Sequence, residues 1–200
     1  MTTLQRAQIL GVLGVLGSLF WLGLNTLLSP DWGPPGSARY LGYEAVNRLW
    51  SLGFAGMLCG YAGLYQRYAL RGSRPGRVGF RLAAIGLVLM MAGNVAEFWL
   101  FSEQAYGEIN GRNLAWIGVL LGMLAALIGA GLMGAAGLRQ RQQLLPRWSA
   151  LLFLSALPAT IILILTAVAL MGLPLVIASV AAGALAAWPG TAALAAQEAS

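Results

Sequence analysis

The amino-acid sequence predicts an all-α fold, a polytopic membrane bundle of six transmembrane helices, and three observations lead to it. Of 200 residues, 59% are hydrophobic and only 9% are charged, whereas a soluble domain carries roughly 25% charged residues. Apolar windows of about 20 residues, the length that crosses a hydrocarbon core about 30 Å thick, recur along the chain. The charged residues lie mostly in the segments between these windows.

The apolar windows give the helices in order, five of them long and the sixth short. Pro174 suits the first turn of the sixth helix, because proline has no backbone N–H to leave unpaired there. Met171 and Gly172 then form a tight hairpin between the last two helices, with a single broken segment as the alternative. The predicted ranges are 8–28, 44–66, 79–101, 113–137, 149–170 and 173–188. Residues 1–188 form one transmembrane domain, and 189–200 form a short disordered cytoplasmic tail.

The arginines predict the orientation of the bundle. Nine of the 12 basic residues fall before the first helix, or in or beside the segments after the second and fourth helices. The positive-inside rule places that side in the cytoplasm, together with both termini. Arginine used to the exclusion of lysine, with abundant Ala and Gly, suggests a bacterial genome and hence the plasma (inner) membrane. The nine arginines are Arg6, Arg67, Arg71, Arg74, Arg77, Arg81, Arg139, Arg141 and Arg147.

Composition also excludes several kinds of chemistry. The chain has no His and a single Cys, Cys59, which removes haem or zinc held by His, Ser/His catalysis and an internal disulfide. We therefore expect no cofactor and no metal. Glu44 and Glu97 are the remaining candidate bases for an intramembrane enzyme, and the interpretation leans against catalysis. Nucleic acid is not an expected partner, because the basic residues flank apolar windows instead of covering a polar face.

Small residues predict where helices pack. Membrane helices associate through close backbone approach, which favours Gly and Ala at a spacing of four. The fourth and second predicted helices carry such stripes, and the fifth and sixth contain no charge, so helices four, five and six are the expected surface for a homo- or hetero-oligomer. The stripes are Gly118, Gly122, Ala126, Ala130 and Gly134 in helix four and Gly53, Gly56, Gly60 and Gly63 in helix two.

Five polar residues are the candidates for ligand binding or ion coupling. Glu44, Asn47 and Arg48 share one face of the second predicted helix, and Asn94 and Glu97 share one face of the third, all in the outer half. Ionisable groups inside a membrane helix are costly and commonly functional. We therefore predict an outward-facing polar pocket between these two helices. In this pocket the Glu97 carboxyl group would share Arg48 with Glu44 as an ion-pair partner, form an ion pair with Arg112, or remain protonated.

Two functions remain open at this stage. The first is a non-catalytic membrane component, either an accessory or assembly subunit or a small binding protein whose pocket holds an amphipathic molecule. The alternative is a small proton- or solute-coupled transporter or channel subunit that uses Glu97. The lipid bilayer is a partner in either case, and Arg71, Arg74 and Arg77 are candidates for contact with anionic lipid head groups.

Overall fold

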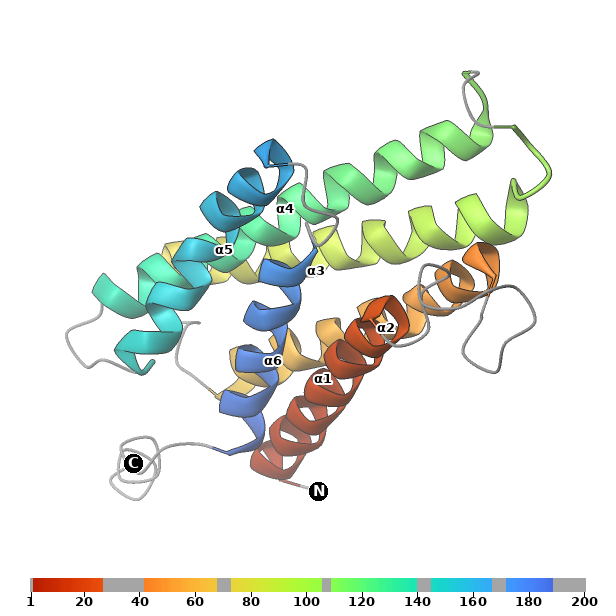
Figure 1. The fold of residues 1–200 in the computed structure, drawn as a ribbon. Helices are drawn as coiled ribbons and strands as arrows, with labels where there is room; N and C mark the ends of the chain where they lie inside the picture. The colour runs from red at the N-terminus through yellow and green to blue at the C-terminus, as the bar shows by residue number, and fades with distance from the viewer. Residues whose placement is uncertain are drawn as a thin grey trace.

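The computed structural model describes residues 2–26, 42–67, 73–105, 109–139, 145–166 and 172–188, and every regular element in these ranges is helical. The predicted all-helical fold is confirmed (Figure 1). The elements are α1 (Thr3–Thr26), α2 (Tyr43–Arg67), α3 (Arg74–Val95), the π-helix η3 (Ala96–Leu100), α4 (Gly111–Arg139), α5 (Arg147–Leu165) and α6 (Leu173–Ala187). The predicted tail, 189–200, and residues 167–171 between α5 and α6, including Met171, lie outside the described residues.

Two helices begin five residues before their apolar windows, because polar residues cap them. Thr2 and Gln5 form a capping box at the start of α1: each side chain accepts a hydrogen bond from the backbone N–H of the other, at 3.2 and 2.9 Å. At α3, the Ser73 hydroxyl oxygen accepts from the N–H of Gly76 at 3.1 Å, and Pro75 occupies the first turn.

Four of the described helical segments are long and apolar enough to cross a membrane: α1, α3 with η3, α4 and α5. The 25-residue α2, which carries Glu44, Arg48 and Arg67, is not in this group. Helix α6 is apolar but has only 15 residues, or about 22 Å at 1.5 Å per residue. The described helices therefore indicate association with a membrane.

The bundle consists of two three-helix units. In the first unit α1 packs along both α2 and α6, and in the second α4 packs along both α3 and α5 (Figure 1). Contacts of α2 with α3 and of α5 with α6 join the two units. Helix α6 is largely buried by this arrangement, with Ala178 and Ala182 fully covered. Helix α5, in contrast, exposes large apolar side chains, among them Leu151 and Ile162.

Small residues form the contacts inside each unit. On α3, Gly79, Gly86 and Gly93 recur every seven residues and face α4 at Gly129, Gly122 and Ala115, which have the same spacing in the opposite direction. In the first unit, the helix-two stripe packs as predicted: Gly56 and Gly60 lie against Gly17 and Gly14 of α1. In the helix-four stripe, Gly122 contacts α3 and Gly134 contacts α5, but nothing lies within 4 Å of a Cβ built on Gly118.

The helices alternate in direction, so that their arginine-bearing ends gather at one end of the bundle. The guanidinium Nη1 of Arg67, at the end of α2, donates a hydrogen bond to the Ala186 carbonyl at the end of α6, at 2.5 Å. A cation suits the carbonyl end of a helix, where orphan acceptors and the helix dipole carry negative charge. The opposite end of α6, at Gly172, packs against Trp21 near the end of α1. We call this opposite end, at which Arg48 and Arg112 lie, the outer end, and the end with Arg67, Arg74, Arg77, Arg139 and Arg147 the arginine-bearing end.

Candidate functional site

The outer ends of α2, α3 with η3, and α4 carry a polar cluster, made of Glu44, Asn47, Arg48, Asn94, Glu97 and Arg112. Its interior members are nearly inaccessible: Asn47 is 3% exposed, Asn94 1% and Glu97 2%. The Glu44 and Arg48 side chains at its edge are 49% and 39% exposed and lie 3.8 Å apart as an i,i+4 ion pair. The five residues predicted from the sequence thus lie at the same end of neighbouring helices.

Helix η3 shapes this cluster on the α3 side. At its end the Phe101 N–H donates to the Ala96 carbonyl at 2.9 Å, a bond that spans five residues and widens the last turn. Carbonyls in a last turn lack partners within the helix. The Arg48 Nε donates to one of them, on Phe98, at 2.9 Å, and the Arg48 guanidinium lies over the Trp99 ring at 5.3 Å. Arg48 therefore ties α2 to the end of η3.

Arg112 is the residue of the cluster that the sequence prediction did not include among the site residues. It is 7% exposed, and its Nη1 donates to the carbonyls of Ser102 and Gln104 at 2.8 and 3.1 Å. Its Nη2 lies 3.4 Å from Glu44, which therefore serves both arginines. A signal was present: Arg112 stands in the first turn of α4, where the helix dipole disfavours a cation unless other groups hold it.

The cluster is balanced in charge. Its two carboxyl groups, when ionised, match its two guanidinium groups in number, and its other members are amides. Among the described residues, no group of three or more Cys, Asp or Glu side chains could hold a metal ion. Both arginines already donate to backbone carbonyls. This arrangement joins the two three-helix units at their outer ends.

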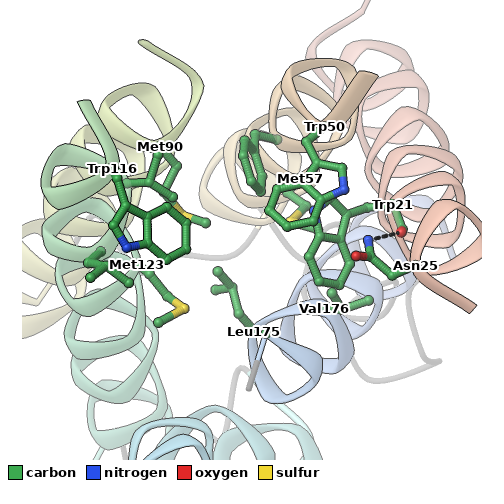
Figure 2. A pocket seen from close by; sticks show the side chains of 13 residues that line it. Trp21, Asn25, Trp50, Met57, Met90, Trp116, Met123, Leu175 and Val176 are labelled. Carbon is green, nitrogen blue, oxygen red and sulfur yellow. Dashed lines mark hydrogen bonds between the residues drawn. The ribbon is translucent and has the colours of Figure 1, made fainter. Parts of the chain in front are cut away.

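A cavity of about 90 Å³ lies between the two units (Figure 2). Figure 2 shows Trp116, Met90 and Met123 on one side and Trp21, Trp50 and Met57 on the other. Asn25, whose Nδ2 donates to the Trp21 carbonyl at 2.7 Å, is its only polar lining side chain among the described residues apart from the indoles. The remaining lining residues are Phe54, Val119, Leu120, Gly172, Leu175 and Val176.

The cavity and the cluster share three helices. Trp50 follows Asn47 by three residues, Trp116 follows Arg112 by four, and Met90 precedes Asn94 by four. Offsets of three or four residues lie on one helix face. The polar cluster therefore stands about one turn, or roughly 5 Å, above the cavity. None of the five predicted site residues lines the cavity itself.

The arginines predicted to contact lipid lie at the opposite end of the bundle. Arg74 and Arg77 are exposed in the first turn of α3. Arg71 lies outside the described residues. The structure therefore places two exposed cations next to each other at the arginine-bearing end.

Comparison with known proteins gives no match: no family model matches the chain, and neither a curated protein nor a solved structure is similar to it. A function must therefore come from the site itself, since fold alone does not determine activity.

Proposed function

We propose that the chain crosses a bacterial inner membrane six times, with both ends in the cytoplasm. Four described segments are long and apolar enough to do so. Arg67, Arg74, Arg77, Arg139 and Arg147, at the ends of α2, α3, α4 and α5, gather at one end of the bundle, and the positive-inside rule assigns the end richer in arginine to the cytoplasm. The 15 residues of α6 are short for a 30 Å core. Its burial against α1 and α2 keeps most of its surface away from lipid.

We propose further that the protein is a non-catalytic membrane component that binds a small amphipathic molecule. The observation that carries this proposal is the Trp- and Met-lined cavity between the two units, which a packed core would not leave. Ligand sites are typically concave and apolar, with few polar groups nearby. The polar cluster above the cavity then acts as a clasp that holds the two units at a fixed spacing.

Native mass spectrometry of the protein, extracted gently from its own membrane, tests this proposal. We expect a protomer that retains one small molecule in stoichiometric amount. A foreign subunit instead would establish the accessory role, for which the exposed apolar faces of α4 and α5 are the proposed contact surface. A bare protomer or homo-oligomer with nothing retained would contradict the binding function.

One observation favours a second candidate, a transporter or channel subunit that couples to protons or a solute. Glu97 is a carboxyl group only 2% exposed, placed where α2, η3 and α4 meet at the junction of the two units. Movement between the units would change its surroundings, and buried carboxyl groups of this kind serve as proton relays in transporters.

Flux measurements in liposomes distinguish this candidate. If Glu97 carries the coupling, Glu97→Gln abolishes proton or solute flux, because the amide has the same shape but cannot be ionised. Glu103→Gln is the matched control, because Glu103 is exposed and lies at the same end of the bundle. This variant should transport like the wild type. Equal flux in wild type and Glu97→Gln would remove Glu97 from the mechanism.

A further inference from the structure

The cavity exists because α6 begins deep in the bundle. Gly172, just before α6, packs against the ring of Trp21, which lies five residues from the end of α1. Five residues correspond to about 8 Å. Leu175 and Val176, in the first turn of α6, border the cavity at this depth (Figure 2). The cavity thus extends from Asn25, one residue before the end of α1, down into the apolar layer.

The size of the cavity restricts the shape of its occupant. An apolar cavity of about 150 Å³ holds a benzene ring, whereas this one measures about 90 Å³. A stretch of a few methylene groups fits this volume, whereas a fused ring system, which is larger than benzene, would require repacking. Three methionines in the lining, Met57, Met90 and Met123, are unbranched and adapt to an irregular chain.

The polar cluster argues against recognition of a charged head group. The Arg112 guanidinium is 7% exposed and donates to two backbone carbonyls, as well as lying beside Glu44. Arg48 donates to Phe98 and pairs with the same carboxylate. Both guanidinium groups are thus already engaged by acceptors of the protein, and burial closes Arg112 to a phosphate or carboxylate.

We propose that the cavity binds one linear hydrocarbon chain, the acyl chain of a bilayer phospholipid. The inference rests on the proposed binding function and names the class of ligand. The acyl chain enters the apolar cavity from the outer leaflet of the bilayer, at the depth of Trp21, Trp50 and Trp116. Its head group stays in the lipid layer, so that selectivity is for chain shape and not for charge.

Photo-crosslinking tests the inference directly. The full-length protein is reconstituted in phosphatidylcholine vesicles with a diazirine in the middle of one acyl chain. After illumination, the attached residues are mapped by mass spectrometry. We expect cross-links at Met90 and Met123, which lie between helices, besides those at lipid-exposed residues such as Ile85, which is 60% exposed.

Val176→Phe should fill the cavity and abolish the cross-links at Met90 and Met123, because Val176 lines it and is only 2% exposed. Val88→Phe makes the same change at a position on α3 that is 45% exposed, and should leave those cross-links intact. If Val176→Phe fails to fold, Leu120→Trp fills the cavity from its partly exposed rim.

The outcomes separate this inference from the function on which it rests. Cross-links confined to exposed residues, or undiminished in Val176→Phe and Leu120→Trp, would overturn the acyl-chain occupant. A retained polar molecule or free fatty acid in native mass spectrometry, together with such a pattern, would leave the binding function standing. Nothing retained and no internal cross-links would overturn both.

Discussion

Replacing Gly122 by Ala should lower the free energy of unfolding by at least about 2 kcal/mol, because it forces α3 and α4 apart. A Cβ at this position would lie 2.6 Å from the Gly86 carbonyl oxygen and 2.8 Å from the Met90 nitrogen. Both neighbours are backbone atoms, so no side chain can rotate away. Membrane helices depend on such close backbone packing, since lipid supplies no hydrophobic drive between them. Reversible unfolding in mixed micelles measures the change.

Gly118→Ala is the matched control, one turn away on the same helix. Nothing lies within 4 Å of its built Cβ, and Ala favours a helix over Gly by about 1 kcal/mol. We therefore expect this variant to be as stable as the wild type or slightly more stable. Equal losses in both variants would mean that the effect is not steric, and equal stability in both would contradict the close approach of α3 and α4.

The periodic features of the fold were predictable because a bilayer imposes them. An apolar window of fixed length and a cluster of arginines at its end follow from the hydrocarbon thickness and the cost of moving charge. The first residues of α1 and α3 were predicted less well, because Thr2 and Ser73, which cap these helices, lie outside the apolar windows. The sequence contained the signals, a threonine three residues before a glutamine and a serine two residues before a proline.

Packing partners were harder to infer. A spacing of four marked the stripe in α4, but the contact with α3 uses a spacing of seven, carried by Gly79, Gly86 and Gly93. That contact leaves Gly118 outside it and Gly134 facing α5. A small residue shows that a helix can be approached closely, but not by which neighbour. The partner depends on the global arrangement of the units.

The sequence predicted only part of the candidate site, because the rest depends on how the two units are arranged. Costly polar residues at helix spacing pointed to Glu44, Asn47, Arg48, Asn94 and Glu97, which the structure brings to one end of the bundle. The cavity gave no such signal. Its lining comes from α1, α2, α3, α4 and α6, and it depends on the depth at which α6 begins. Three tryptophans line it, Trp21, Trp50 and Trp116, but tryptophan near the end of a membrane helix is also the usual anchor at the lipid interface and so does not by itself indicate a cavity.

For the polar cluster we expect a change in the free energy of unfolding comparable to that at the glycine contact between α3 and α4. Arg112→Gln should lower the free energy of unfolding by about 3 kcal/mol, because removing one partner from a buried charged network leaves the others unsatisfied. Glutamine is too short to reach the Ser102 and Gln104 carbonyls that Arg112 now bonds at 2.8 and 3.1 Å. Arg74→Gln, at an exposed position on α3, should change stability by less than about 0.5 kcal/mol.

Glu44→Gln separates the two kinds of contact that Arg112 makes. The Glu44 side chain is 49% exposed and lies 3.4 Å from Arg112, so solvent weakens this ion pair to about 1 kcal/mol or less. We therefore expect Glu44→Gln to destabilise the protein much less than Arg112→Gln. A loss as large as that of Arg112→Gln would mean that the stabilising contact of Arg112 is the ion pair with α2, and not the bonds to the carbonyls that follow η3. A double variant no weaker than Arg112→Gln alone would place all of the Glu44 contribution in its contact with Arg112.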